Sequence, residues 1–393
     1  MAQPNYVCSW LQDRISDQTG NFVIFGREFA QLQNVILDPD QAQGHRGGEN
    51  MTLVWNQEEN SEYLKLKQSY FKLRCEKVLA KPFNRPNSHL NDWMGSYVCS
   101  NDQVRHASSN VIPEMTIAIQ RYEYVNLYHT MTDYYNAFLV MLLFQKRPEN
   151  VNILFIDGHP YGGLDDTWDS LFKHTYRAGA LRQKTLFSNL IWGIPGYNSP
   201  LNNHELTFVP YLNDFRNFFV KQHNVESISK TLDCDNLSVL FIWRRDYVAH
   251  PRNPSGLVSR KIKNEEELVD HVSKLLPGHN IKALQLDKLP MQKQLKIVSK
   301  TDILIGMHGA GLSHTLFLPN HSGLIELYPI YWPETNRHFR MMATWRGLHY
   351  LTWKNHDIAN EFPQKLTYVP PQSVGNMVKE MAVKICQNKL RIT

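Results

Sequence analysis

Two successive series of apolar strands and helical segments constrain this chain more than any other feature of its sequence. In the first series, strands are expected at residues 115–119 and 151–156, and residues 123–144 between them carry apolar side chains at helical spacing. The second series begins with an apolar strand at 238–242 and ends with one at 348–353. Because strands that alternate with helices form parallel sheets, the pattern predicts an α/β fold with two Rossmann-like, doubly wound domains.

The chain is long enough for these two domains and for an additional N-terminal segment. It has 393 residues, of which 42% are hydrophobic, and a single core rarely grows to that size. We expect the N-terminal segment to be a loop-rich cap or stem, because Gly, Pro, Asn, Asp and Ser interrupt its short strand-like pieces. The expected segments are the cap at 1–112, Rossmann-like domains at 113–236 and 237–370, and a closing helix at 371–393.

Charge and hydropathy exclude several classes of protein. The formal net charge is only +5 and no block of five like charges occurs, so no nucleic-acid-binding tail is expected. The longest apolar run, residues 137–144, is far shorter than the roughly 20 residues that cross a bilayer. The first 13 residues lack a basic start followed by an apolar stretch, so we expect neither a signal peptide nor a membrane anchor in this chain. On this evidence the protein is cytosolic, or its anchor lies outside this chain.

The cysteines are spaced too widely for a zinc site, because no two stand at the separation of metal ligands. They are Cys8, Cys75, Cys99, Cys234 and Cys386. One or two disulfides are compatible with this spacing, but their pairing is not determined by it. Sequons at Asn50, Asn236 and Asn320 would permit N-glycosylation in a lumenal protein, although such triplets also arise by chance. The compartment therefore stays open on these grounds.

The most informative motif is the stretch 301–312, an apolar strand that runs into small residues and then into an expected helix at 312–317. Its turn consists of His308, Gly309, Ala310 and Gly311. Glycines let the backbone approach a ligand, and the start of the following helix presents N–H groups and a partial positive charge to a phosphate. The alternative is a tight turn that needs its glycines only for backbone geometry.

Four arginines follow the strand at 238–242, at the edge where open α/β sheets bind ligands. They are Arg244, Arg245, Arg252 and Arg260. Arginine suits phosphate because its guanidinium donates two parallel hydrogen bonds. For most of these side chains a solvated loop position is the alternative reading.

Glu326 lies in the middle of an apolar strand expected at 324–328. A buried carboxylate requires a hydrogen-bond partner. The ribose hydroxyls of a nucleotide would supply one, and an ion pair with a nearby basic side chain is the alternative.

Two polar residues, His129 and Asp133, stand four apart on the helix expected at 123–144 and therefore share one face. Either could act as a general base towards a hydroxyl group. The alternative is a core histidine bonded to an aspartate. The pairs at 38/40 and 233/235 have the Asp-x-Asp spacing of metal sites, but we expect no metal there because neither pair ends a core strand.

Several stretches together resemble glycosyltransferase family sixty-one. They are residues 302–318 with Glu326, residues 345–350, and the segments 121–133, 155–159 and 245–252, of which the last three look closest to plant β-1,2-xylosyltransferase. A more distant likeness is to the EGF-domain-specific O-GlcNAc transferases of the family. The resemblance covers about residues 95–355.

The resemblance implies a GT-B architecture, with two Rossmann-like domains facing a cleft, and inverting, metal-independent transfer. It implies UDP-xylose or UDP-GlcNAc as donor substrate, no further cofactor, and a lumenal address in the Golgi or endoplasmic reticulum. Arg260 matches an arginine of the family that precedes a capped helix, which favours it as a diphosphate ligand. Trp243 stands where the family has an arginine, so the choice between Arg244 and Arg245 stays open.

The function predicted from these residues is transfer of xylose to a hydroxyl of an N-glycan core. The C-terminal domain would bind the UDP-sugar, and Asp133, oriented by His129, would deprotonate the acceptor. The expected partners are the donor and a glycan or glycoprotein acceptor, with no nucleic acid. A protein O-linked β-N-acetylglucosaminyltransferase is the first alternative, and a glycan-binding module without catalysis is the second.

Overall fold

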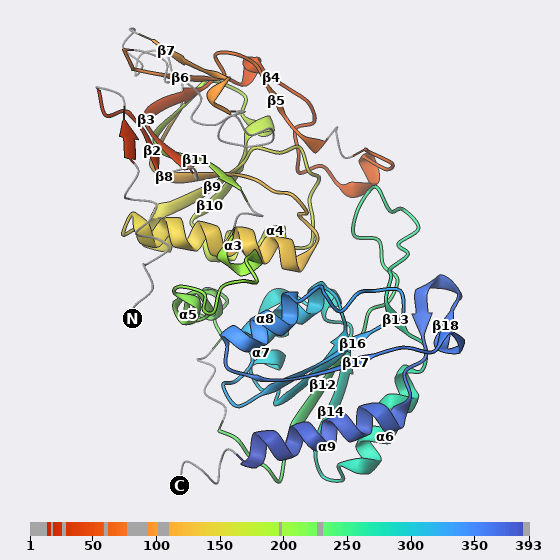
Figure 1. Cartoon of the computed structure of the whole chain (residues 1–393). Helices are drawn as coiled ribbons and strands as arrows, with labels where there is room; N and C mark the ends of the chain where they lie inside the picture. Colours follow the sequence, from red (N-terminus) through yellow and green to blue (C-terminus); the bar gives the residue numbers. More distant parts are fainter. Residues whose placement is uncertain are drawn as a thin grey trace. The chain divides into compact units, whose positions relative to one another are not determined.

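The computed structural model describes most of the chain. The described residues are 14–16, 19–25, 29–58, 62–76, 93–100, 110–195, 199–225 and 231–387. Residues 1–13, which include Cys8 and in which we expect neither a signal peptide nor an anchor, lie outside the described residues. The chain divides into two compact units (Figure 1): unit 1 comprises residues 1–202 with 249–254, and unit 2 comprises 203–248 with 255–393.

Unit 1 is built on a nine-stranded sheet in the order β1-β2-β3-β11-β8-β9-β10, with β6 and β7 attached beside β3. Its strands are β1 (Arg14–Ser16), β2 (Phe22–Phe25), β3 (Phe29–Leu37), β6 (Phe71–Leu73), β7 (Tyr97–Cys99), β8 (Asn110–Gln120), β9 (Val151–Phe155), β10 (His174–Arg177) and β11 (Thr185–Pro195). Strands β11, β8, β9 and β10 are parallel. All five residues of β9 are buried, as expected for a parallel strand that is covered on both faces.

The N-terminal segment expected to form a separate cap instead extends this sheet. Strand β3 pairs antiparallel with β11 over seven residue pairs, and β6 pairs with β3. A short ladder, β4 (Ala42–Gln43) with β5 (Lys65–Leu66), lies outside the main sheet. The pairing of β3 with β11 joins residues about 150 positions apart, so no local pattern could have indicated it.

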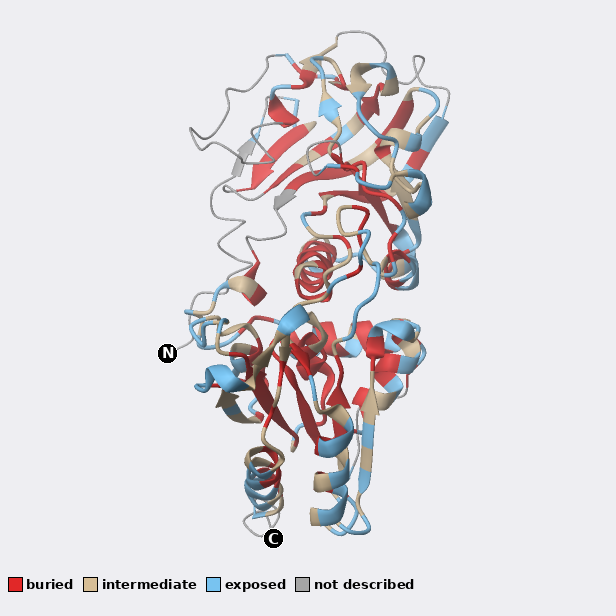
Figure 2. Ribbon diagram, turned by 90° about the vertical axis from the view of Figure 1, so that its right-hand side faces the viewer, coloured by how far each residue is buried: buried red, intermediate tan, exposed pale blue. Residues whose placement is uncertain are grey.

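Two helices connect the parallel strands of unit 1. Helix α3 (Leu127–Leu143) begins at Asn126, whose side chain accepts a hydrogen bond from the Tyr128 N–H, as an N-cap residue does. Nearly every side chain of α3 is buried, which makes it a core helix. Helix α4 (Asp165–Leu171) follows β9. Figure 2 shows that burial in both units is concentrated on the sheets and the helices against them.

Unit 2 contains a five-stranded, all-parallel sheet in the order β14-β12-β15-β16-β17. The strands are β12 (Ser238–Ile242), β14 (Asn280–Leu284), β15 (Ile303–Met307), β16 (Gly323–Tyr328) and β17 (His349–Lys354). Numbered along the chain, this order is 2-1-3-4-5, which is one of the two common doubly wound orders. The predicted α/β class with parallel sheets is confirmed, and the GT-B arrangement stays a prediction.

The helices of unit 2 are α5 (Leu212–Gln222), α6 (Glu265–Leu275), α7 (Met291–Val298), α8 (His338–Trp345) and α9 (Pro371–Gln387). A small sheet of β13 (Lys261–Ile262), β19 (Leu366–Thr367) and β18 (Glu361–Phe362) lies apart from the main one. Asn264 precedes α6, but its side chain makes no capping bond and instead contacts Glu267 and the Val369 backbone.

The limits of the two units differ from the expected domain limits at two places. Helix α5 belongs to unit 2, whereas the sequence pattern placed the boundary after residue 236. Arg216 of α5 donates hydrogen bonds to the carbonyl oxygens of Leu316 and Leu318, which attach this helix to unit 2. The loop 249–254 belongs to unit 1, although the residues on both sides of it belong to unit 2.

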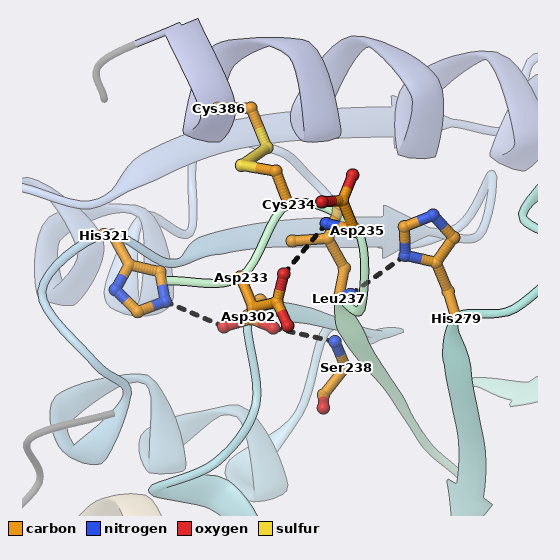
Figure 3. Close-up of a disulfide and its surroundings, with 9 residues drawn as sticks. All are labelled: Asp233, Cys234, Asp235, Leu237, Ser238, His279, Asp302, His321 and Cys386. Carbon is orange, nitrogen blue, oxygen red and sulfur yellow. Dashed lines mark hydrogen bonds and ion pairs between the residues drawn. A yellow bond between two sulfur atoms is a disulfide. The ribbon is translucent and has the colours of Figure 1, made fainter. Parts of the chain in front are cut away.

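Two disulfides are present, Cys75–Cys99 in unit 1 and Cys234–Cys386 in unit 2. The second joins the segment before β12 to helix α9 (Figure 3). Beside it, the buried carboxylate of Asp302 accepts hydrogen bonds from the Ser238 N–H at 2.7 Å and from the His321 ring at 2.7 Å. Among the described helices, none combines the length and the apolar character needed to cross a bilayer.

Candidate functional site

The candidate site lies at the carboxyl ends of β12 and β15 in unit 2. These two strands are neighbours, with Ile242 opposite Gly306. After β12 the chain continues to β14 on one side of the sheet, and after β15 it continues to β16 on the other side. The carboxyl ends of β12 and β15 therefore form the topological switch point, where open α/β sheets bind ligands. Arg244 follows the first strand and His308 follows the second, so both predicted residues come to the same edge.

Arg244 lies directly against the turn that follows β15. Its Nε donates a hydrogen bond to the Ser259 carbonyl at 3.1 Å. A Cβ atom on Gly309 would stand 2.1 Å from Nη1 of Arg244, so the close approach of the guanidinium requires glycine at this position. Burial lowers the pKa of Arg244, yet an arginine remains charged at neutral pH.

Arg245, the second candidate after β12, has different surroundings from Arg244. Its guanidinium is exposed and forms an ion pair with Glu265 at the start of α6. The hydrogen bond that Arg245 donates to Glu265 is the main reason why the pKa of Arg245 is raised. Of the two neighbouring arginines, Arg244 therefore faces the turn, and Arg245 is neutralised by a carboxylate.

Arg260 has an unusual backbone and an aromatic support. Its φ of 59° lies in the left-handed region, which costs a non-glycine residue on the order of 1 kcal/mol or more. The Arg260 N–H donates to the Tyr331 hydroxyl at 2.9 Å, and the guanidinium carbon lies 3.9 Å from the centre of the Trp332 ring. Burial and the charge of Arg244 lower the pKa of Arg260 to about 10, so it is cationic at neutral pH.

His308 is held by the buried carboxylate of Glu326. Its Nδ1 contacts Glu326 Oε1 at 2.6 Å, and the Tyr350 hydroxyl donates to Glu326 Oε2 at 2.8 Å. Both oxygens of Glu326 thus accept hydrogen bonds from the chain itself, so the geometry matches a structural partnership with a basic side chain rather than a free ribose ligand. With Nδ1 engaged, Nε2 is the ring nitrogen left for a ligand. Burial lowers the pKa of His308, Glu326 opposes this, and the two nearby arginines reinforce it.

Aromatic side chains connect these residues into one cluster. The His308 ring lies 5.7 Å from Trp332 and 5.1 Å from Tyr328, measured between ring centres. Trp332 therefore contacts both His308 and the guanidinium of Arg260. Within the described part of the chain, neither Arg244 nor Arg260 forms an ion pair with a carboxylate. The cluster therefore presents two cations that no carboxylate of the described residues neutralises.

The turn itself continues into a 3-10 helix, η9 (Ala310–Phe317), with Gly309 as its N-cap residue. The helix expected at 312–317 is thus present, but with the tighter 3-10 geometry. Ala310 and Gly311 form its first turn, where backbone N–H groups lack partners within the helix. Such groups can bind an anion at the same place as the two arginines.

A surface pocket of about 620 Å³ adjoins the cluster on the side of Arg244. It is lined by the basic side chains Lys261 and Lys263 and by the first turn of α6, residues 265–267. Lys261 forms an ion pair with Asp246 at 2.7 Å. The pocket combines both signs of charge, so it suits a polar ligand rather than a purely anionic one.

The predicted base residues, His129 and Asp133, lie one turn apart on α3 in unit 1. Asp133 is only 3% exposed, and burial is the main cause that raises its pKa well above the ordinary value, with Asp157 adding to this and Arg121 opposing it. His129 is half-buried, and burial lowers its pKa to about 4. Of the two side chains, the histidine is the more accessible.

Unit 1 also contains a buried network of charges that the sequence pattern did not reveal. Arg121, at the end of β8, donates to both oxygens of Asp157 at 3.0 and 2.7 Å and to Asp165 at 2.5 Å. Arg177 donates to the other oxygen of Asp165 at 2.8 Å. Burial raises the pKa of Asp157, but the charge of Arg121 outweighs it and brings this pKa to about 2.

Arg252 has a different surrounding from the other three arginines of its group. It lies in the loop that belongs to unit 1, where it donates to Glu123 at 3.1 Å and stands near the buried carboxylate of Glu62. Glu62 in turn contacts His159 at 2.8 Å. Arg252 is therefore a paired residue of unit 1.

No group of three or more His, Cys, Asp or Glu side chains that could hold a metal occurs among the described residues. The carboxylate of Asp38 accepts from Lys72 at 2.6 Å. In the Asp-x-Asp pair at 233 and 235, the Asp233 carboxylate accepts a hydrogen bond from the Asp235 backbone N–H, beside the Cys234–Cys386 disulfide. The absence of a metal requirement stays a prediction.

Four residues of the cluster were not singled out from the sequence: Tyr328, Tyr331, Trp332 and Tyr350. Tyr350 falls within the stretch 345–350 that carried the family resemblance, but its contact with Glu326 depends on the register of β16 with β17. Tyr331 and Trp332 follow the carboxyl end of β16. The only available signal for them was their position after a core strand.

Comparison with known proteins adds independent evidence. The family model described as Glycosyltransferase 61 matches residues 127–325. A β-1,2-xylosyltransferase (RCN11) of Oryza sativa subsp. japonica is 26% identical over 360 residues, covering 80% of this chain and 66% of the rice protein. The β-1,2-xylosyltransferase of Arabidopsis thaliana is 25% identical over 87% of this chain and 75% of its own length. The EGF domain-specific O-linked N-acetylglucosamine transferase of Drosophila melanogaster is 30% identical over 61% of this chain, but this covers only 45% of its length.

Proposed function

The chain belongs to the glycosyltransferase 61 family, and from this premise we propose that it is an inverting, metal-independent transferase that uses a UDP-sugar. The observation that carries the proposal is the convergence of Arg244, Arg260 and the His308 turn at the switch point of the second sheet. Two cations without carboxylate partners among the described residues, next to the N-terminal amides of η9, are the chemistry that a diphosphate requires.

The proposed role of this cluster is to stabilise the leaving group. As the bond between the sugar and the diphosphate breaks, negative charge grows on the phosphate oxygen. Arg244, Arg260 and the N-terminal amides of η9 are fixed in place before the reaction, so they stabilise that charge without further reorganisation. Glu326 and Tyr350 hold His308 in one orientation, and His308 Nε2 then contacts the same anion. Glu326 acts here through His308.

The base in our proposal is Asp133 of unit 1. It removes the proton from an acceptor hydroxyl that attacks the anomeric carbon from the face opposite the diphosphate, which inverts the configuration there. Burial raises the pKa of Asp133 and lowers that of His129, and a raised pKa makes a carboxylate a stronger base. His129, one turn away and half-buried, positions the acceptor or the carboxylate.

Xylose from UDP-xylose is the proposed sugar, and an N-glycan hydroxyl is the proposed acceptor. The two plant relatives support this choice, since they align with 80% and 87% of this chain. The alternative is transfer of N-acetylglucosamine to a protein hydroxyl, supported by the 30% identity to the fly enzyme. A catalytically inactive glycan-binding module is the third candidate, and it would bind glycans without releasing UDP.

A donor and acceptor screen tests the proposal directly. The purified chain is incubated with UDP-xylose or UDP-GlcNAc and with N-glycan or EGF-domain acceptors, and UDP release and product mass are measured. We expect UDP-xylose with an N-glycan to react fastest. Release of no UDP from any combination, together with measurable glycan binding, would favour the inactive module.

Substitution of Asp133 tests the proposed division of labour between the two units. Asp133→Asn should lower kcat by about 10²- to 10⁴-fold, the usual contribution of a general base, and should leave the Kd for UDP unchanged. His129→Asn should lower kcat less than Asp133→Asn does. A loss of UDP affinity in the Asp133 variant as large as its loss of kcat would contradict the proposal.

The proposed location is the lumen of the Golgi or endoplasmic reticulum. Two disulfides are typical of proteins that fold in an oxidising compartment. The sequons at Asn50 and Asn236 are exposed, so the folded chain leaves room for a glycan there. Glycosidase treatment of protein secreted from eukaryotic cells, followed by mass measurement, tests this location.

A further inference from the structure

Two buried arginines at the far end of η9 are not used by the proposed reaction. Arg216 lies on α5 and Arg346 directly follows α8, and they are 6% and 9% exposed. Neither forms an ion pair with a carboxylate of the described chain. Burial lowers the pKa of both, to about 9 for Arg216, where the charge of Arg346 adds to the effect, and to about 10 for Arg346. Buried cations without counter-ions are rare unless other groups stabilise them.

The stabilising groups are the last carbonyls of η9 and the chain that follows it. Arg216 donates from Nε to the Leu316 carbonyl at 2.5 Å and from Nη2 to the Leu318 carbonyl at 3.0 Å. Arg346 Nη2 donates to the same Leu318 oxygen at 3.2 Å and to Asn320 Oδ1 at 2.8 Å. Carbonyls at a helix C-terminus carry partial negative charge and lack partners within the helix. The two guanidinium groups therefore clamp this end of η9.

Helix η9 needs support from outside because its own conformation is unfavourable. It runs for eight residues as a 3-10 helix, whereas such helices usually end after three or four residues. The buried polar atoms Ser313 Oγ, His314 Nε2 and Thr315 Oγ1 have no hydrogen-bond partner among the described residues. Each unsatisfied buried group costs free energy. Contacts at the ends of η9 must therefore help to hold it.

The opposite end of η9 is the turn at His308 and Gly309, where the diphosphate is proposed to bind. We infer that Arg216 and Arg346 are positioning residues for this turn: by fixing the carbonyls at one end of η9, they set the place of the amides at the other end. The inference rests on the proposed function. It also has an electrostatic part, because buried charges are screened little by solvent and these two add positive potential along the helix.

A comparison of charge and shape at Arg346 tests the inference, with the Kd for UDP as the readout. Arg346→Met removes both the charge and the hydrogen bonds, and it should raise the Kd by about tenfold, the size of one charge-assisted hydrogen bond. Arg346→Lys keeps the charge but cannot bond two acceptors in the same fork, so its Kd should lie between those of the wild type and the Met variant.

Val378→Ala in α9 serves as the matched control. Val378 is fully buried in the core of unit 2, so its truncation lowers the melting temperature without touching η9. Its Kd for UDP should equal that of the wild type. An unchanged Kd in folded Arg346→Met, or an equal change in Val378→Ala, would overturn the inference, because either result would reduce the arginines to general stabilisers.

Two further measurements keep the test decisive. If Arg346→Met does not fold, Arg216→Lys and Asn213→Ala each remove part of the clamp with a smaller change, since Asn213 accepts from Arg346 at 3.1 Å, and both should still raise the Kd relative to Val378→Ala. If the wild type itself binds no UDP, the proposed function fails. If the wild type binds UDP and none of the variants at Arg216, Asn213 or Arg346 weakens this binding, the positioning role is refuted and the proposed function is not.

Discussion

Arginines in the two units have opposite surroundings. In unit 1, Arg121 is fully buried and surrounded by the carboxylates of Asp157 and Asp165. In unit 2, Arg244 and Arg260 lie against a glycine turn and a tryptophan ring, with no carboxylate bonded to either in the described chain. A cation that the protein neutralises stabilises its fold, whereas a cation that it leaves unpaired is available to a ligand. Substitutions of these two kinds of arginine should therefore affect different measurements.

The largest expected effect is on stability in unit 1. Arg121→Met leaves Asp157 and Asp165 buried without their main partner, and breaking a buried pair in this way costs about 3–5 kcal/mol. We expect the free energy of unfolding, measured by urea denaturation, to fall by that amount. Lys384→Met is the control, because the Lys384–Glu380 pair is exposed and should contribute less than about 0.5 kcal/mol. Equal losses in both variants would contradict the comparison.

The next effect concerns binding in unit 2. Arg260→Met should raise the Kd for UDP by about 10- to 100-fold, since a hydrogen bond to a charged group contributes roughly 1.5–3 kcal/mol. Its free energy of unfolding should change little. Arg245→Met is a matched control because Arg245 pairs with Glu265, and its Kd should stay within about twofold of the wild type. A stronger effect at Arg245 would reverse our assignment of the phosphate ligand.

Gly309→Ala sharpens the comparison, because it should displace Arg244 without removing it. The added Cβ would stand 2.1 Å from Arg244 Nη1, while the φ of 166° is accessible to alanine. We expect about a tenfold higher Kd for UDP, the loss of one charged contact, with little change in melting temperature. At Gly163 of unit 1 an added Cβ meets no atom, so Gly163→Ala should bind UDP as the wild type does. Additive effects of Gly309→Ala and Arg244→Met would show that the two residues do not act together.

The smallest expected effect is the pH dependence of donor binding. Burial keeps the pKa of free His308 below its usual value of about 6.5, and a bound diphosphate should raise it. Affinity should then increase as the pH falls through the pKa of the bound state and level off below that of the free state. We expect about a threefold to fivefold change, less than the tenfold of one full pKa unit.

This measurement should use a UDP-sugar, because the terminal phosphate of UDP itself titrates near pH 6. His308→Asn should flatten the profile. A profile of unchanged slope in that variant would assign the titration to another group.

The sequence predicted the strands and the turn of the site, but not which side chains contact one another there. Strands β12 and β15 and the turn at His308 each follow from a local apolar pattern. The left-handed conformation of Arg260 and its contact with Trp332 depend on residues about 70 positions apart, so no local pattern contains them. The same holds for Glu326, whose two partners come from the ends of neighbouring strands.

Unit 1 was harder to predict for the same physical reason. Most of its N-terminal strands are short, and the longest of them, β3, pairs with β11, far along the chain. The helix with His129 and Asp133 was predicted correctly, because its apolar spacing is continuous over 17 residues. Their catalytic roles stay a prediction.

The Cys234–Cys386 bond closes a covalent ring, since its cysteines are 152 positions apart and enclose all five strands of the second sheet. A single peptide bond cut by a protease within this ring would leave the two fragments linked. Such nicked molecules would migrate as one intact chain on a denaturing gel, and they would separate into two bands only after a reducing agent is added.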